Sequence, residues 1–140
     1  RLRDVKKRAA ELGIEVIEGA YHPQDWLQAV KGFEEEKEGG ARCAVCFRHR
    51  LEETGNRAKK NGYDLFATTL TTGRNKKADV INPLGAQVAS KLGIPFLAKD
   101  FKKNAIRETS MLRCETLGII RQHYCGCVFS RKETEQAKKS

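Results

Sequence analysis

The sequence lacks long hydrophobic runs, and this excludes several classes of protein. Its apolar stretches are only a few residues long, such as Gly118–Ile120, whereas a membrane-spanning helix needs about 20 largely apolar residues in a row. A secretory signal peptide is also missing, because no apolar stretch follows the charged start of the chain. The 140 residues, 39% hydrophobic and 32% charged, suffice for one domain with its own core. We expect a single domain over residues 1–140, cytoplasmic and without membrane contact.

Cysteines are too few for a disulfide scaffold. There are five, an odd number in a chain longer than most secreted disulfide-rich domains. Four of them form two close pairs, Cys43 with Cys46 and Cys125 with Cys127. Cys114 stands alone in a helical stretch, and we expect it to be a small buried apolar residue. Because no export signal is visible, we expect reduced thiols, so the two pairs indicate chemistry rather than structural cross-links.

Acidic residues are outnumbered by basic ones. Lysine and arginine total 27 and aspartate and glutamate 18, which gives a formal net charge of +9. Such an excess favours a polyanionic partner, most commonly nucleic acid. Residues 131–140 are mixed in sign and are expected to be a solvated tail. The chain opens without methionine inside an amphipathic pattern, so we expect the domain to be N-terminally incomplete.

Helical patterns alternate with short apolar stretches along the chain. Helical spacing predicts helices at residues 2–12, 25–30, 43–61, 84–92 and 105–117. Short apolar runs predict strands at residues 14–17, 63–70 and 94–98. This alternation predicts an α/β fold of three layers, Rossmann-like or HUP-like, with a mostly parallel sheet, helices on both faces and the N-terminal strand missing. Sites in such sheets lie at the carboxyl ends of strands, so we expect the loops at 68–77 and 99–103 on the functional edge.

The first cysteine pair, Cys43 and Cys46, opens a predicted helix. A helix N-terminus stabilises thiolates through its free N–H groups and its dipole, and this spacing points both sulfurs the same way. Zinc ribbons, thioredoxin-like redox sites and iron–sulfur clusters all use such pairs. The pattern suggests a cluster, although a cluster normally takes four ligands and only these two are well placed.

The second pair, Cys125 and Cys127, is separated by one glycine. A single spacer makes a poor chelate loop, and oxidation would close a very small, strained ring. Strain makes a disulfide easy to reduce again, and Gly126 gives the backbone the freedom that this ring requires. The pair therefore predicts a redox-active dithiol, with two zinc ligands as the alternative.

Five motifs together resemble one known family. They are Arg42-Cys-x-x-Cys-Phe-x-x-Arg-Leu51, Thr68-Thr-Leu-Thr71, Asn75-Lys-x-Ala-Asp-Val-Ile-Asn82, Asp100-Phe-Lys-Lys103 and Arg121-Gln-x-Tyr-Cys-Gly-Cys127. In this order and spacing they are similar to the QueH family of epoxyqueuosine reductases, and the resemblance extends to about Ser130. Two departures stand out. Thr72-Gly-Arg-Asn-Lys76 replaces a Ser-Pro-His-Lys-like run, and Asn104 replaces a glycine.

The resemblance implies an iron–sulfur oxidoreductase of tRNA queuosine biosynthesis. Such an enzyme removes the epoxide oxygen of epoxyqueuosine at the wobble position, with electrons from a donor that the sequence does not identify. The family implies a 4Fe-4S cluster with Cys43 and Cys46 as ligands, and Cys125 with Cys127 as the redox pair. An adjacent cysteine pair completes the cluster in the family. It is absent here and expected upstream of Arg1. A second iron ion is a further expectation.

Other residues are assigned roles on the same basis. Asp79 and Asp100 lie on predicted strand-end loops and are candidate metal ligands or proton donors, although aspartates in such positions more often cap a helix or form a salt bridge. Tyr124 is a candidate to stack on the modified base or donate a proton, with packing as the alternative. Basic residues expected to contact tRNA phosphates are Arg48, Arg74, Lys76, Lys77, Lys102, Lys103 and Arg121.

Two other functional classes stay open. In a zinc-stabilised nucleic-acid-binding module, all four paired cysteines would hold one zinc without catalysis. Such a protein is colourless, whereas an iron–sulfur protein is brown. A thiol–disulfide oxidoreductase is the second alternative, and it is weakened because the polar stretch Glu34–Gly40 precedes Cys43 where a strand is usual.

Overall fold

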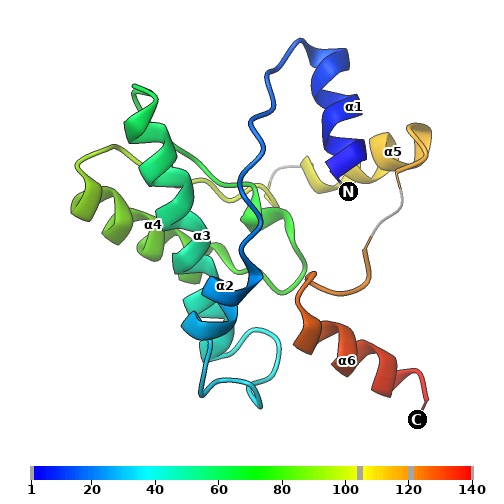
Figure 1. Cartoon of the computed structure of the whole chain (residues 1–140). Helices are drawn as coiled ribbons and strands as arrows, with labels where there is room; N and C mark the ends of the chain where they lie inside the picture. Colours follow the sequence, from blue (N-terminus) through cyan, green and yellow to red (C-terminus); the bar gives the residue numbers. More distant parts are fainter. Residues whose placement is uncertain (1, 104–105, 120–121, 140) are drawn as a thin grey trace.

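The computed structural model describes residues 2–103, 106–119 and 122–139, and these ranges are mainly helical. Figure 1 shows the helices of the described part and one short 3-10 helix. They are α1 (Leu2–Leu12), α2 (Pro23–Ala29), α3 (Ala41–Lys60), η1 (Leu70–Thr72), α4 (Ala78–Leu92), α5 (Ile106–Thr116) and α6 (Val128–Ala137).

The predicted α/β fold with a parallel sheet is wrong, because the described residues form no sheet. Segments 63–70 and 94–98 run side by side, but they pair only at one isolated parallel bridge between Phe66 and Phe96. The Phe66 amide donates to the Pro95 carbonyl at 3.0 Å, and the Leu97 amide donates to the Phe66 carbonyl at 2.9 Å. Pro95 has no N–H group, so it cannot donate a further hydrogen bond between the two segments. After Phe66 the first segment continues into the 3-10 helix η1.

The third predicted strand, at residues 14–17, finds no partner in the part of the chain that the structure describes. Its apolar side chains stay in solvent, since Ile14 is 60% exposed and Ile17 is 44% exposed. A lone pair of short strands is marginal in water. The apolar pattern therefore identifies segments with an extended backbone. It does not show whether such a segment has a neighbouring strand to pair with.

The predicted helices are confirmed, because their hydrogen bonds are local. The predicted bounds of 2–12 are those of α1. The predicted helix at 84–92 ends on Gly93, which adopts the left-handed conformation at φ 68°, as helix C-termini often do. The predicted long helix over 43–61 is α3, and Asn61 is its C-cap.

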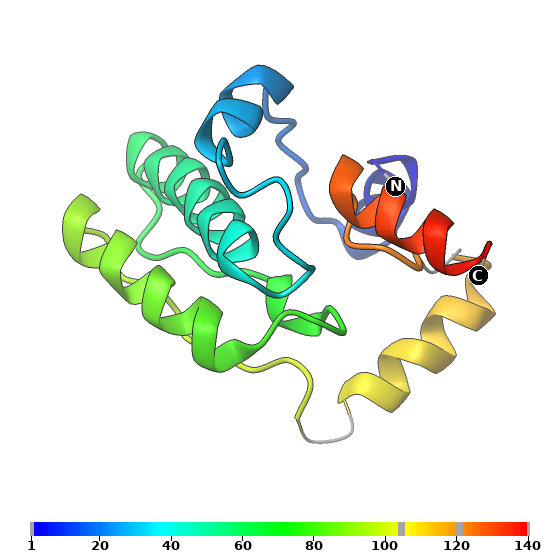
Figure 2. The same cartoon turned by 90° about the horizontal axis from the view of Figure 1, so that it is seen from below.

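The hydrophobic core lies between α3 and α4, which run side by side in both views (Figures 1 and 2). Its buried apolar side chains are Phe47, Leu51, Ala58, Phe66, Leu70, Ile81, Val88 and Ile94. The segments that form the isolated bridge pack onto the same core, with the Phe66 and Phe96 ring centroids 5.0 Å apart. This core fixes the start of α3 and the loop after η1, which both border the site.

Helices α1 and α5 lie apart from the α3–α4 pair (Figure 1), whereas α6 contacts the start of α3 through Arg42 and Glu133. Residues 131–137 belong to α6, and most of them are exposed. Among the described helices, none combines the length and the apolar character that a bilayer crossing requires.

Candidate active site

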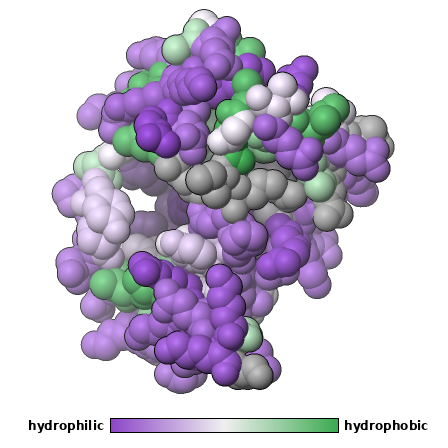
Figure 3. All heavy atoms as spheres, turned by 90° about the vertical axis from the view of Figure 1, so that its right-hand side faces the viewer, coloured by the Kyte–Doolittle hydropathy of each residue, from purple (hydrophilic) through white to green (hydrophobic). Residues whose placement is uncertain are grey.

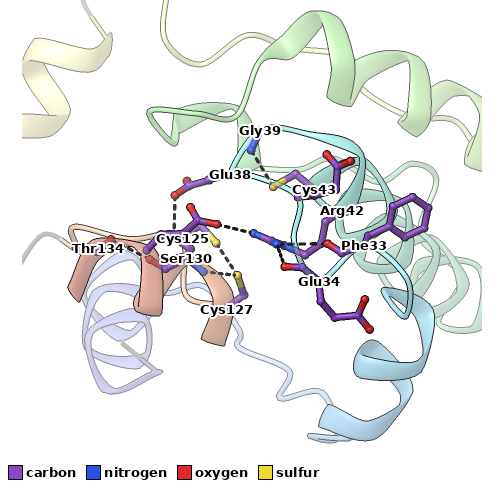
Figure 4. Close-up of polar contacts among 12 residues, drawn as sticks. Phe33, Glu34, Glu38, Gly39, Arg42, Cys43, Cys125, Cys127, Ser130 and Thr134 are labelled. Atoms are coloured by element: carbon purple, nitrogen blue, oxygen red, sulfur yellow. Dashed lines mark hydrogen bonds and ion pairs between the residues drawn. The ribbon is translucent and has the colours of Figure 1, made fainter. Parts of the chain in front are cut away.

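The two cysteine pairs approach each other although nearly eighty positions separate Cys46 from Cys125, and Figure 4 shows Cys43 on the side of the site that faces Cys125 and Cys127. The Cys125 thiol donates to the Cys127 sulfur at an Sγ–Sγ distance of 3.4 Å. Burial raises the pKa of the Cys43 thiol, and Cys125 and Cys46 lie near enough to add to this increase. All four are half-buried and none forms a disulfide. We call Cys43, Cys46, Cys125 and Cys127 the thiol cluster.

Two helix N-termini hold the thiol cluster. Cys43 lies in the first turn of α3, and its sulfur accepts the Gly39 amide at 3.1 Å. Cys127 is the N-cap of α6, and its sulfur accepts the Ser130 amide at 3.3 Å. Gly126 adopts φ 113°, a conformation that side-chain-bearing residues avoid. This glycine therefore allows Cys125 to turn back toward Cys127.

Burial raises the pKa of two of these thiols, Cys127 and Cys43. It raises the pKa of Cys127 to about 11, and hydrogen bonding from Cys125 adds to the increase, whereas the Ser130 amide and the Arg42 guanidinium lower it. Burial also raises the pKa of Cys43, against the Gly39 amide. Desolvation thus outweighs the stabilisation that a helix N-terminus gives a thiolate. Without metal, Cys127 holds its proton at neutral pH.

Arg42 joins the two sides of the thiol cluster. Its guanidinium is buried, with the whole residue 1% exposed. It donates to the carbonyls of Phe33 at 3.4 Å and Glu34 at 2.7 Å, and it pairs with the Glu133 carboxylate of α6 at 3.0 Å. It also lies 4.6 Å from the centroid of the Phe129 ring. These contacts connect the turn after α2, the start of α3 and helix α6.

A large cavity borders the thiol cluster at Cys125 and has a volume of about 1010 Å³. Its walls come from α1, α3, the η1 region, α5 and the segment before Cys125. The lining includes cationic and hydroxyl side chains from α1, α3 and the η1 region, and they are Arg8, Arg50, Thr54, Thr68, Thr69, Thr72, Arg74 and Lys76. Figure 3 shows a largely hydrophilic face with a hollow across its middle. The cavity is therefore suited to bind an anionic group beside the Cys125–Cys127 dithiol.

Some of the predicted site residues line this cavity. Tyr124, Arg74 and Lys76 do so together with Cys125. Lys102 is outside the lining, and its ammonium donates to the carbonyls of Arg74 at 3.3 Å and Lys76 at 2.8 Å. Lys102 therefore holds the loop that carries the two cavity cations.

The remaining predicted basic residues are elsewhere. Arg48 donates to the Gln87 side chain of α4 at 2.8 Å, which directs its guanidinium away from the cavity. Lys77 is the N-cap residue of α4, and Lys103 is exposed outside the cavity lining. Arg121 lies outside the described residues.

The two predicted aspartates lie outside the cavity lining. Asp79 is exposed in the first turn of α4, where a carboxylate stabilises the helix dipole. Asp100 accepts the Lys102 amide at 3.0 Å and so shapes its own turn. Their expected position on a sheet edge fails together with the sheet.

Three residues at the site were missed from the sequence. Glu38 lines the cavity, but in the sequence it was one acid in a polar loop. Ser130 is fully buried between Cys125, Cys127 and Glu38, and its place three residues after an N-cap was the available signal. Arg42 was noticed only as part of the cysteine motif.

The thiols suit iron in donor type but not in number. Thiolates are the usual ligands of iron–sulfur clusters, and Cys43 with Cys46 offers two of them on one helix. Within residues 2–103, 106–119 and 122–139, no group of three or more His, Cys, Asp or Glu side chains is arranged to hold a metal ion. We therefore derive no chemical step through a cluster.

Comparison with known proteins identifies the family. The family model described as epoxyqueuosine reductase QueH matches residues 1–133. The chain is 41% identical over 119 residues to epoxyqueuosine reductase QueH of Streptococcus pyogenes serotype M1, covering 85% of this chain and 47% of that protein. It is 34% identical over 139 residues to the Thermotoga maritima protein of the same name, covering 97% and 72%. The chain spans about half the length of the streptococcal relative. By the extent of these matches, it belongs to the QueH family.

Proposed function

We propose that this chain carries the dithiol and substrate cavity of an epoxyqueuosine reductase. The reaction removes the epoxide oxygen of epoxyqueuosine in a tRNA anticodon and gives queuosine. Relatives that match most of this chain bear the name of this activity. The observation that carries the proposal is the position of the Cys125–Cys127 pair, with its sulfurs 3.4 Å apart on the wall of a cationic cavity.

The dithiol can supply the two electrons and two protons that the reaction consumes. Both carbon–oxygen bonds of the epoxide break, a carbon–carbon double bond forms and the oxygen leaves as water, which takes up two electrons and two protons. Oxidation of Cys125 and Cys127 breaks two S–H bonds, forms one S–S bond and releases two electrons and two protons. The two half-reactions balance. A low-potential one-electron carrier then reduces the disulfide in two steps, and its identity is open.

Cys43 and Cys46 are proposed as two ligands of a 4Fe-4S cluster. Such a cluster, when bound, supplies electrons one at a time. A helix N-terminus suits thiolate ligands, and binding of iron would overcome the burial that raises the pKa of the Cys43 thiol. A second iron ion stays a prediction from the family resemblance.

The cavity is proposed to take the modified nucleotide and its flanking phosphates. Recognition of a single-stranded RNA loop uses bases splayed onto aromatic rings and phosphates held by cations. Tyr124 is the aromatic side chain next to the dithiol, and Arg74 and Lys76 are cations on the same cavity wall. Threonine hydroxyls around η1 are suited to hydrogen-bond ribose and phosphate oxygens.

The test is Cys125→Ser in anaerobically purified protein supplied with iron and sulfide. Formation of queuosine in epoxyqueuosine-containing tRNA, measured by nucleoside mass spectrometry, should be abolished, whereas the iron content should stay at the wild-type level. Cys114→Ser is the matched control for loss of one thiol and should keep its iron. Loss of iron from Cys125→Ser would move Cys125 into the ligand set. A wild-type protein that contains one zinc bound to all four paired sulfurs would contradict the reductase.

A further inference from the structure

Glu38 places a carboxylate beside the dithiol (Figure 4). It lies in the loop between α2 and α3, is half-buried and lines the same cavity as Cys125. Its Oε2 atom accepts the Ser130 hydroxyl at 2.8 Å. The Ser130 oxygen in turn accepts the Cys125 amide at 3.1 Å. Because Ser130 is fully buried, this chain of two hydrogen bonds fixes the carboxylate against the residue that carries the cavity-lining thiol.

Glu38 differs from the other carboxylates around it. Glu36, two residues earlier, accepts the Ala41 amide at 3.2 Å and so caps α3, and Glu133 is paired with Arg42. For Glu38, no salt bridge forms within the ranges that the structure describes. Asp4, the other acidic residue of the cavity lining, comes from α1. Glu38 alone thus combines an unpaired carboxylate, a place on the cavity wall and a link to the dithiol.

We propose that Glu38 is the proton-transfer group of this site. It takes a proton from the Cys125–Cys127 dithiol as the disulfide forms and delivers it to the epoxide oxygen as that oxygen leaves as water. The carboxylate returns to its starting state, since one proton enters and one leaves, and the overall balance is that of the proposed reduction. This role rests on the proposed function.

The experiment compares Glu38→Gln with the wild type in steady-state reduction of epoxyqueuosine-containing tRNA, with reduced methyl viologen as the one-electron donor. General acid–base groups typically contribute a factor of about 100 to 10,000. We therefore expect kcat to fall by at least about 100-fold, with KM for the tRNA unchanged. Glu35→Gln, an exposed neighbour outside the cavity lining, is the matched control and should keep the wild-type kcat.

Two further measurements separate proton transfer from a structural role. Glu38→Gln should keep the wild-type melting temperature but should form the Cys125–Cys127 disulfide with diamide more slowly than the wild type, because the same carboxylate takes up the thiol proton. Glu38→Ala should regain activity when formate is added, because a small carboxylic acid can take over the transfer. An unchanged kcat in Glu38→Gln, or a loss of kcat that comes with a lowered melting temperature and is not rescued by formate in Glu38→Ala, would overturn the proposal. A wild-type protein that makes no queuosine would instead refute the proposed function and this role with it.

Discussion

At the residue scale, the protonation of Cys127 determines how the free dithiol reacts. Thiolates react with alkylating agents and thiols do not, and burial raises the pKa of Cys127 to about 11. In metal-free, reduced protein, the rate at which iodoacetamide modifies Cys127 should therefore keep rising between its ordinary pKa of 9.0 and about 11. Mass spectrometry of the peptide that carries Cys127, over a series of pH values, measures this rate.

The same peptide in denatured protein is the internal control. Unfolding removes the burial that raises the pKa of Cys127, so the rate in denaturant should level off near the ordinary value. A folded protein whose Cys127 rate levels off at the same pH as the denatured one would show that burial does not control this thiol. Circular dichroism of the same samples reports whether the helical fold survives the most alkaline conditions.

Single residues were predicted well where a chemical group and its spacing were both distinctive. The Cys125-Gly126-Cys127 run predicted a redox-active dithiol, and the sulfurs lie 3.4 Å apart, but the redox role itself stays a prediction. Glu38 was not predicted, because its neighbours Glu34 and Glu36 have the same chemistry and only the fold separates their partners. Carboxylates in a charged loop carry no local signal of which one will face a cavity.

At the scale of elements, Arg42 is the contact that holds α6 against the start of α3. Arg42→Met removes two hydrogen bonds to the carbonyls of Phe33 and Glu34 and the ion pair with Glu133. Buried acceptors left without donors cost about 1–3 kcal/mol each, so we expect the free energy of unfolding to fall by about 2–4 kcal/mol. Urea denaturation measures this loss. Hydrogen exchange should show α6 losing more protection than α4.

Glu133→Gln is the matched control for the ion pair alone. Glu133 is 41% exposed at its side chain, and an amide oxygen can still accept from the Arg42 guanidinium. The expected loss is about 1 kcal/mol, well below that of Arg42→Met. Equal losses in the two variants would mean that the carbonyl contacts of Arg42 contribute nothing. Unchanged protection of α6 in Arg42→Met would contradict its role in holding this helix.

Helices could be predicted from the sequence because each one satisfies its own backbone. The apolar spacing in α1 and the glycine after α4 are local signals, and both agree with the structure. Strands depend on partners that the local pattern does not contain, so the segments at 14–17, 63–70 and 94–98 were predicted without a way to test their pairing. Helix α6 was expected as part of a solvated tail, because a cysteine N-cap and a mixed-charge run give a weak helical signal.

At the scale of the whole molecule, motif order predicted the family while element order failed to predict the fold. Alternating helices and short apolar runs predict a parallel sheet only if the runs pair with one another. Among the described residues, only Phe66 and Phe96 pair. The cysteine motifs carry chemistry that does not depend on the sheet. They meet because α3 and α6 bring their N-termini together around Arg42.

The net charge of +9 and the cations that line the cavity predict that RNA binding weakens as the salt concentration rises. Each phosphate neutralised on a single strand changes the slope of log affinity against log salt by about 0.7. If Arg74 and Lys76 each meet one phosphate, the double variant Arg74→Gln, Lys76→Gln should bind an anticodon stem-loop more weakly, with a slope shallower by about 1.4. Fluorescence anisotropy over a salt series measures both quantities.

The control for this prediction removes the same charge from another place. Lys138→Gln, Lys139→Gln takes two cations from the exposed end of the chain, outside the cavity lining. Because release of counterions depends on cations that contact phosphates, this variant should keep the wild-type slope. If both double variants shift the slope equally, the RNA responds to the overall charge and not to the cavity. The phosphates of the anticodon would then have to lie elsewhere on this surface.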